Sequence, residues 1–424
     1  MYSTYKLDNG LTVLLVPNPT SQAVVVDAFV KVGSRNEEEH INGISHFLEH
    51  LNFKGTKNYS TAKGLSEAID SVGGVMNANT GKEHTQYYAQ VESRHIVLAF
   101  DVVTDLFRYP TFKPAEIEKE KGVIIEEINM YLDTPQHHIM DMLEEGMWDN
   151  HSLGRNIAGS PAHVRAITKK DITDYRRNFY NPKNTIVAVA GKFDEEEVRL
   201  LVSKYWSDYK GKEEVALPEK AEGARQKKMV MQSKQTNQAH FAIGFRGFDY
   251  NDTRNYAMDI LSAVLSGGMS GRLFTEVREK RGLAYYIDAN HSSYQDVGAF
   301  IVRAGVEIGK IDMSLEVVIK ELKKMRNNLL TLKEMRKAKE YLKGTVALSL
   351  EGTSSKMSWC LQQLAFAKKV EEPTTWMKKI DAVTPQEVRK AAQAVIRGDL
   401  TTLAVIGPYS DKDKSSFEQI ISRL

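Results

Sequence analysis

The segment from Gly43 to Leu51, GISHFLEHL, contains two histidines and a glutamate within five positions. If the segment is helical, His46 and His50 are four residues apart and lie on the same face. Two imidazoles at this spacing can bind one zinc ion, which lowers the pKa of a bound water to about 7. Glu49 lies near the same face, where its carboxylate could take the proton of that water. The segment predicts a hydrolytic zinc site, against the alternative of a helix whose histidines are only half-buried.

A catalytic zinc site usually has a third protein ligand and one open coordination position. The candidate ligands are the carboxylates of a helical stretch that begins near Pro114, namely Glu116, Glu118, Glu120, Glu126 and Glu127. Glu120 and Glu127 are seven residues apart and share a helix face, whereas Glu126 points about 100° away from Glu127. Helical periodicity alone does not choose among the five carboxylates.

The elements that must position these side chains form two similar halves. The first half begins with a hairpin around Asp8–Gly10 and ends with the strand TIVAVAG at Thr185–Gly191, and the second half ends with the similar strand TLAVIG at Thr402–Gly407. We predict the α+β class, with two similar domains that each have an antiparallel sheet and helices packed on one face. Further strands are expected at 23–33, 86–91, 240–245 and within 284–306, and helices at 43–53, from Pro114 past Glu127, at 254–265 and at 314–348.

The domains are predicted at residues 1–207 and 229–424, joined by a charged linker at 208–228 in which 11 of 21 residues are charged. The stretch FKPAEIEKEKGVIIEE in the first half resembles LTLKEMRKAKEYLKGT in the second, which indicates a weak internal duplication. The second copy has Thr345 in the place of Glu127, and it has no matching pair of histidines. We therefore expect a catalytic N-terminal domain and a homologous C-terminal domain without metal ligands.

The composition excludes several other classes of protein. The 424 residues carry a net charge of +2, with 57 basic and 55 acidic side chains interspersed, so the clustered basic surface of a nucleic-acid-binding protein is absent from the sequence. No apolar run is long enough to span a membrane, and the N-terminus lacks the pattern of a signal peptide. Cys360 is the only cysteine, which excludes an internal disulfide. We expect a cytoplasmic protein that binds neither nucleic acid nor membrane.

Several longer stretches of the chain resemble one family of enzymes. HFLEH, followed 76 residues later by Glu-Glu-Ile, resembles the inverted zinc-binding motif of the pitrilysin-type metallopeptidases. The resemblance is to the short branch especially, which includes mitochondrial processing peptidase and its bacterial relatives. It covers essentially the whole chain and extends to NGISHFLEHLNFKGT, GGVMNA, EHTQYYAQV, NHSLGRNIAG, FYNPKNTIVAVAG and SGGMSGRLFTEVREKRGLAYY.

This resemblance implies a zinc metalloendopeptidase that hydrolyses unfolded or extended peptides and holds one zinc ion per chain. The resemblance makes His46, His50 and Glu127 the zinc ligands and Glu49 the general base. Glu120 corresponds to a carboxylate that orients a ligating histidine.

The resemblance also implies roles for four residues outside the metal motif. Arg278 and Tyr285 lie in REKRGLAY, where the family has an Arg and a Tyr that steady the substrate or the tetrahedral oxyanion. Asn77 and Ala78 lie where the family pairs the substrate backbone with the edge of a sheet. Without the resemblance, these four residues would be taken as surface, core and turn residues.

The family encloses its substrate in a chamber of four such domains, whereas this chain supplies two. We therefore expect a homodimer, with a heterodimer containing a related chain as the alternative. Two other functions stay open at this point. One is a non-catalytic scaffold subunit, and the other is a processing-peptidase-like subunit that cleaves precursors rather than peptides in general.

Overall fold

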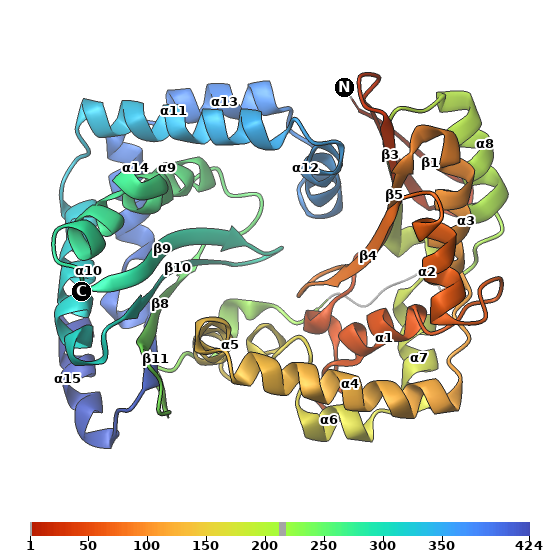
Figure 1. The fold of residues 1–424 in the computed structure, drawn as a ribbon. Coiled ribbons are helices and arrows are strands. Elements are labelled where there is room, and N and C mark those ends of the chain that lie inside the picture. The colour runs from red at the N-terminus through yellow and green to blue at the C-terminus, as the bar shows by residue number, and fades with distance from the viewer. Residues whose placement is uncertain (1, 212–217) are drawn as a thin grey trace. The chain divides into compact units, whose positions relative to one another are not determined.

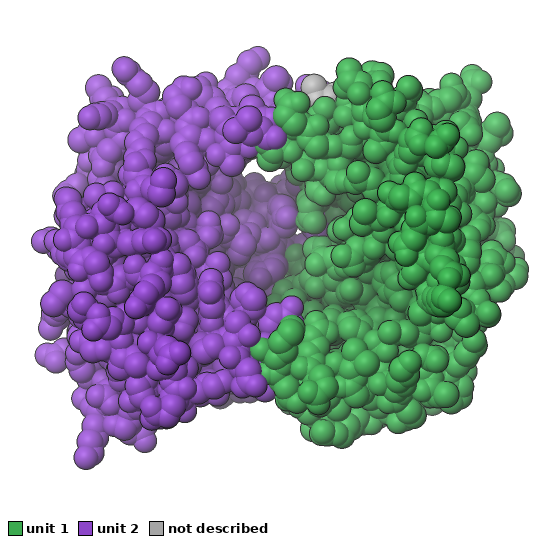
Figure 2. Space-filling model, viewed as in Figure 1, with its two compact units in different colours: residues 1–130, 155–219, 349–365 green, residues 131–154, 220–348, 366–424 purple. Residues whose placement is uncertain are grey.

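The computed structural model describes residues 2–211 and 218–424, which form two compact units (Figures 1 and 2). Unit 1 comprises Met1–Met130, Arg155–Glu219 and Ser349–Ala365, and unit 2 comprises Tyr131–Gly154, Lys220–Leu348 and Phe366–Leu424. The linker predicted at 208–228 lies partly outside the described residues, since 212–217 are not among them. No helix of the described residues has the length and apolar composition needed to cross a membrane.

Unit 1 is built on a six-stranded sheet with the order β1-β2-β6-β3-β5-β4. All neighbouring strands are antiparallel except β2 and β6, which are parallel. β4 forms one edge of this sheet, so one side of its backbone has no strand partner. The strands are β1 (Ser3–Lys6), β2 (Thr12–Pro17), β3 (Ala23–Val30), β4 (Val75–Thr80), β5 (Thr85–Glu92) and β6 (Thr185–Gly191).

Most helices of unit 1 bury one face of this sheet, whereas α12 (Thr353–Phe366) contacts the opposite face at Gln90 of β5. Alternate residues of β3, such as Val24 and Val26, are fully buried in a core shared with Phe47 and Leu51 of α1. Because side chains alternate across a strand, one set faces this core and the other faces away from it. The helices are α1 (Ile44–Asn52), α2 (Ala62–Asp70), α3 (Ile96–Arg108), α4 (Pro114–Leu132), α6 (Pro161–Ala166), α7 (Lys169–Phe179), α8 (Glu195–Trp206) and α12 (Thr353–Phe366).

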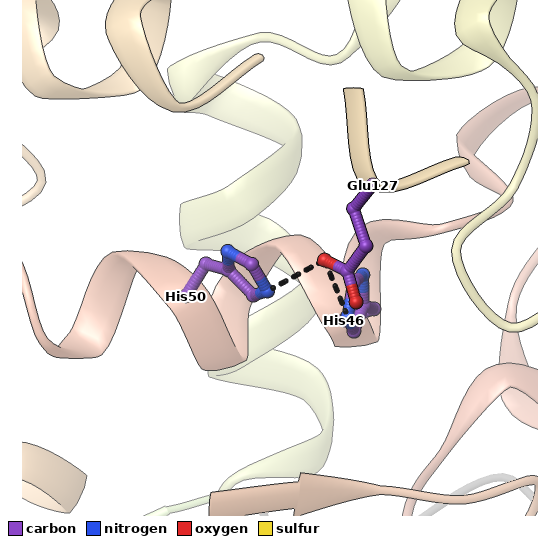
Figure 3. Close-up of side chains that lie close together, drawn as sticks. All are labelled: His46, His50 and Glu127. Carbon is purple, nitrogen blue, oxygen red and sulfur yellow. Dashed lines mark ion pairs between the residues drawn. The ribbon is translucent and has the colours of Figure 1, made fainter. Parts of the chain in front are cut away.

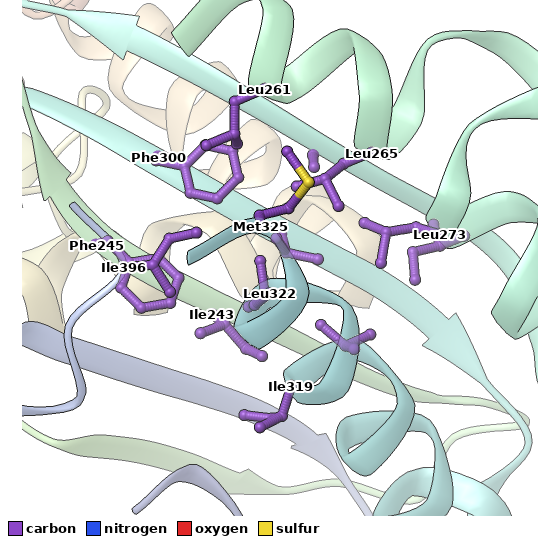
Figure 4. Close-up of a cluster of buried hydrophobic side chains, with 14 of the residues drawn as sticks. Ile243, Phe245, Leu261, Leu265, Leu273, Phe300, Ile319, Leu322, Met325 and Ile396 are labelled. Carbon is purple, nitrogen blue, oxygen red and sulfur yellow. The ribbon is translucent and has the colours of Figure 1, made fainter. Parts of the chain in front are cut away.

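Unit 2 repeats the plan with a five-stranded sheet of order β7-β11-β8-β10-β9, in which only β7 and β11 are parallel neighbours. Figure 4 shows its core, where Ile243, Phe245 and Phe300 from the sheet meet Leu261 and Leu322 from helices. The strands are β7 (Met229–Ser233), β8 (Ala239–Gly247), β9 (Ala284–Ser293), β10 (Gly298–Val306) and β11 (Thr401–Gly407), and the helices are α5 (Pro135–Met147), α9 (Asn255–Ser266), α10 (Ile311–Asn327), α11 (Leu332–Ser349), α13 (Pro373–Ala382), α14 (Pro385–Val395) and α15 (Asp411–Ile421).

The α+β class is confirmed, with two differences in detail. Each sheet includes one parallel pair, and each sheet has helices on both faces, with α12 on the second face in unit 1 and α5 in unit 2. Ala242 of β8 packs with Leu143 of α5, whereas its neighbour Ile243 faces the core of Figure 4. The helix expected at 314–348 is in fact two helices, α10 and α11, because the chain turns between Asn327 and Leu332.

Each unit includes one helix from the other half of the chain. α5 comes from the first half but packs on β8 and β11 of unit 2. α12 comes from the second half but belongs to unit 1, where Thr353 Oγ1 accepts a hydrogen bond from Asn18 at 3.2 Å and Ser354 Oγ donates to Gln90 Oε1 at 3.0 Å. The residue ranges of the two compact units therefore differ from two consecutive halves of the sequence.

Candidate metal centre and active site

Helix α1 begins at a tight turn that fixes the direction of its first residues. Gly43 has a φ of 97°, in the left-handed region, and a Cβ here would lie 2.4 Å from the carbonyl oxygen of Ala158. The buried carboxylate of Glu37 accepts hydrogen bonds from the backbone N–H groups of Gly43 and Ser45 at 2.7 and 2.8 Å. Burial raises the pKa of Glu37, and these hydrogen bonds oppose that shift. The carboxylate therefore caps the helix that carries HFLEH.

Three side chains from α1 and α4 converge next to this helix start (Figure 3). His46 Nε2 lies 3.7 Å, and His50 Nε2 3.4 Å, from Glu127 Oε2. The ligand atoms of the three residues all lie within 4.8 Å of one another. Zinc bound tetrahedrally at about 2.0–2.1 Å holds neighbouring ligand atoms roughly 3.4 Å apart. The three residues therefore fit one zinc ion, and within residues 2–211 and 218–424 they are the one such group.

The orientation of α4 separates Glu127 from the other carboxylates of this helix. Glu126 is exposed to solvent, and Glu118 is 71% exposed and pairs with Lys121 on the surface. Glu127 is 25% exposed and points toward the two histidines. The helix therefore brings only Glu127 of these three to the cluster.

Glu120, which lies on the same face of α4 as Glu127, contacts the Nδ1 side of the His50 ring. Its side chain is 1% exposed; Oε1 lies 2.9 Å from His50 Nδ1, and Oε2 lies 2.9 Å from Lys54 Nζ. Burial raises the pKa of Glu120, but the hydrogen bonds from His50 and Lys54 outweigh burial and lower it. A carboxylate bonded to Nδ1 fixes the ring so that Nε2 faces the cluster.

Glu49 lies beside the cluster on the same helix. Its Oε2 accepts a hydrogen bond from the hydroxyl of Thr80, the last residue of β4. Burial raises the pKa of Glu49, while the Thr80 hydrogen bond and the charge of His50 act in the opposite direction. A carboxyl group with a raised pKa is suited to accept and return a proton near neutral pH.

The two histidines have different electrostatic surroundings. Burial, together with the charge of His50, lowers the pKa of His46 to about 4. For His50, burial acts in the same direction, but the hydrogen bonds that its ring donates to Glu120 and Glu127 outweigh burial and raise the pKa to about 9. The hydrogen bond from His50 lowers the pKa of Glu127 and outweighs burial, which raises it. Zinc binding would displace the proton of His50, and the cluster would then offer an anionic ligand and two imidazole nitrogens, a donor set that suits zinc.

The family relationship follows from comparison with known proteins. The family described as Insulinase (Peptidase family M16) matches residues 12–160, and the one described as Peptidase M16 inactive domain matches residues 166–342. An uncharacterized zinc protease of Bacillus subtilis, YmxG, is 36% identical over 408 residues, which are 96% of this chain and 98% of that protein. The chain belongs to peptidase family M16. This confirms the resemblance to the pitrilysin-type peptidases.

Other M16 relatives agree in length and fold. An uncharacterized zinc protease of Streptomyces coelicolor, SCO5738, is 35% identical over 98% of this chain and 92% of its own length. The crystal structure of a protease from Helicobacter pylori has a TM-score of 0.90 and 25% identity, and the match covers 96% of this chain and 99% of that one. The His46, His50 and Glu127 cluster lies entirely in the first matched region, and the second region is the one described as inactive.

The M16 chain presents Asn77 and Ala78 on its edge strand β4. Asn77 is exposed, and its side-chain oxygen accepts a hydrogen bond from the backbone N–H of Ala78 at 2.9 Å. Ala78 pairs with Tyr87 of β5 on the other side. The edge at these residues has the open backbone that strand addition by a peptide requires.

Arg278 and Tyr285 belong to unit 2, whereas the cluster belongs to unit 1. Arg278 is exposed in a short π-helix, Phe274–Glu279, with its guanidinium 5.0 Å from the ring centre of Phe274. Gly282, at a φ of 60°, ends this segment, and Tyr285 is the second residue of β9 and 60% exposed. The two residues are therefore not on one continuous helix, and both side chains are accessible.

Three residues that the sequence analysis did not assign contact the proposed site. Lys54 holds Glu120, Thr80 holds Glu49, and Glu37 caps α1. Lys54 could have been found, because it lies only four residues after His50, just beyond the end of α1 at Asn52. Thr80 and Glu37 carry no such local signal, since their contacts depend on how the hairpin and the loop before α1 fold back.

Proposed function

We propose that this chain is a zinc metalloendopeptidase, with His46, His50 and Glu127 as the zinc ligands and Glu49 as the general base. The observation that carries the proposal is the convergence of two imidazoles and one carboxylate from α1 and α4, with a second carboxylate, the hydrogen-bonded Glu49, beside them. The relatives named zinc proteases support the same metal and reaction class.

The residues around the cluster divide the work of peptide hydrolysis. Zinc held by the three ligands would supply Lewis acidity toward the scissile carbonyl and the attacking water. Glu49 takes a proton from the attacking water and later gives it to the leaving amine. Glu120, held by Lys54, keeps the His50 ring in the orientation that directs Nε2 to the metal.

The substrate class follows from the edge strand. An extended peptide can add to β4 beside Asn77 and Ala78 through main-chain hydrogen bonds, which select extended backbone with little dependence on sequence. We assign unfolded or extended peptides as substrates, and Arg278 and Tyr285 as groups that steady the substrate or its oxyanion. We also propose that the protein acts as a homodimer, which light scattering on the purified protein would test.

The proposed activity is tested by measuring metal content and cleavage on the same preparations. Wild-type protein should contain about one zinc per chain and cleave a mixed library of unstructured peptides. His46→Ala should lose both zinc and cleavage. Glu49→Gln, which is nearly isosteric, should keep zinc and lose at least about 10² in turnover.

Two results would contradict the proposal. Full zinc occupancy in His46→Ala would show that the metal binds elsewhere. A zinc-loaded wild-type protein that cleaves no peptide would favour the scaffold alternative, which the M16 description of an inactive domain keeps open for the second region. The cleavage products of the library would also separate a general peptidase from one that processes precursors at defined sites.

A further inference from the structure

The hydroxyl of Thr80 connects the edge strand β4 to the base of the proposed mechanism. Thr80 is 9% exposed, and its Oγ1 donates a hydrogen bond to Glu49 Oε2. A carboxylate has two oxygens, so occupation of Oε2 leaves Oε1 to accept a proton. A glutamate without this contact is free to adopt other staggered rotamers.

The turn that follows Thr80 is held in place by the backbone of a distant segment. Ser34 N donates to the Gly81 carbonyl at 3.1 Å, and Arg35 N donates to the Lys82 carbonyl at 2.8 Å. A Cβ at Gly33 would lie 2.2 Å from Gly81 O, so the two backbones approach as closely as glycine allows. The end of the β4–β5 hairpin is therefore fixed by main-chain contacts.

Buried charges reinforce the same contact. Arg35 Nη1 lies 2.6 Å from Glu83 Oε1, and the two side chains are 1% and 5% exposed. Lys82 Nζ donates to the Arg155 carbonyl at 2.7 Å. Charged groups taken out of water in this way stay in place only when they are paired, so the turn cannot shift without separating them.

The segment from Gly33 to Glu37 also fixes the helix that carries Glu49. Its last residue, Glu37, caps the N-terminus of α1 through Gly43 and Ser45. One segment thus holds both the hairpin end with Thr80 and the helix with Glu49. The relative position of the Thr80 hydroxyl and the Glu49 carboxylate is set by the fold rather than by their own hydrogen bond alone.

We propose that Thr80 is a positioning residue for Glu49, which it holds in the orientation needed for proton transfer while linking it to the peptide-binding edge of β4. This inference rests on the proposed function, because it takes Glu49 as the base and Asn77 and Ala78 as the peptide-binding edge. A peptide that adds to β4 engages the same strand that orients the base. Removal of the hydroxyl should therefore affect the chemical step more than substrate binding.

The test compares Thr80→Val, which has the same shape without the hydroxyl, with Thr80→Ser, which keeps it. Thr85→Val is the matched control, because Thr85 pairs with Thr80 across the hairpin but donates to the Val32 carbonyl and not to Glu49. Thr80→Val should keep its zinc and its KM within about twofold and lose about 10- to 100-fold in kcat. Thr80→Ser should recover most of this loss, and Thr85→Val should keep the wild-type kcat.

Wild-type turnover in Thr80→Val, or equal losses in Thr80→Val and Thr80→Ser, would overturn the inference and leave the peptidase assignment intact. Crystal structures of the zinc-loaded variants give a readout that is independent of activity. The Glu49 carboxylate should move in Thr80→Val and stay in place in Thr80→Ser. If the wild-type protein cleaves no peptide, the proposed function fails, and these structures still decide the positioning role, since an unmoved carboxylate in Thr80→Val refutes it.

Discussion

Glu127 allows a sharp test of the metal site, because its neighbour Glu126 is a matched control on the same helix. Glu127 Oε2 lies 3.4 and 3.7 Å from the two imidazole nitrogens, whereas Glu126 is exposed about 100° away around α4. Zinc sites with four ligands bind with about 10–16 kcal/mol, or roughly 2.5–4 kcal/mol per ligand if the ligands share it equally. Glu127→Gln should therefore weaken zinc binding by about 10²- to 10³-fold.

The measurement is competition with a fluorescent zinc chelator of known affinity, after both variants have been stripped of metal. Glu126→Gln should bind zinc within about twofold of the wild-type protein. Thermal unfolding with and without zinc provides a second readout, because a ligand at 100 times its Kd stabilises the folded state by about 2.7 kcal/mol. Glu127→Gln should lose most of this stabilisation at a zinc concentration that saturates Glu126→Gln.

Two outcomes would refute the reasoning. Loss of zinc in Glu126→Gln with retention in Glu127→Gln would show that the register of α4 is wrong by one residue. Wild-type affinity in both variants would show that the third ligand is not on this part of α4 at all.

Three other substitutions have defined outcomes. Lys54→Met removes the second partner of the buried Glu120 and should weaken zinc binding by about 10-fold, whereas Lys54→Arg should keep most of the affinity. The same chelator competition measures both variants. Equal zinc affinities in Lys54→Met and the wild-type protein would show that Lys54 does not support the site. Asp27 is 1% exposed, its carboxylate has no hydrogen-bond partner among the described residues, and burial raises its pKa well above the usual value of 3.8. Asp27 is therefore protonated in the folded protein at pH values where it is ionised in the unfolded chain. The free energy of unfolding of the wild-type protein falls as the pH rises above about 4, by about 1.4 kcal/mol per pH unit, up to the raised pKa. Asp27→Asn should then be more stable than wild type at pH 7 but not near pH 3.5, and a urea-unfolding difference that is constant with pH would contradict this. Tyr285→Phe should keep its zinc and slow the cleavage of every peptide at least about tenfold, and unchanged turnover would exclude an oxyanion role.

The metal motif was readable from the sequence because it is local. His46 and His50 share one helix, and the four-residue spacing alone places them on one face. Glu127 was harder, since helical periodicity left five carboxylates open and only the family resemblance chose among them. The structure brings that residue to the histidines because of the way α4 is oriented, which depends on tertiary packing.

One contact and one strand could not be read from the sequence. Thr80 and Glu49 are separated by 31 positions and meet only through the hairpin end that Gly33–Arg35 holds. β4 itself, VMNANT, has few of the β-branched and aromatic residues that favour strands, since an exposed edge does not require them.

The break between α10 and α11, by contrast, had a readable signal. Thr331 Oγ1 accepts from Glu334 N, while Glu334 Oε2 accepts from Thr331 N, a capping box that marks the start of a helix. The sequence analysis did not use this Thr-x-x-Glu spacing, and its single helix at 314–348 therefore ran across the break. No sequence signal indicates which sheet α5 and α12 pack on, because an amphipathic helix does not specify the sheet that it covers.

The exchange of α5 and α12 has a consequence for how the protein is made on the ribosome. Unit 1 needs Ser349–Ala365 in addition to the residues that end at Glu219, so 146 further residues must be synthesised before its last helix is available. At about 5–20 residues per second, this takes roughly 7–30 s. Throughout this interval α5 lacks β11, one of the two strands on which it packs, because β11 is synthesised only at Thr401–Gly407. The nascent chain therefore carries two unfinished cores at once, and a chaperone that shields apolar helices should associate with it until the final quarter of the sequence has emerged.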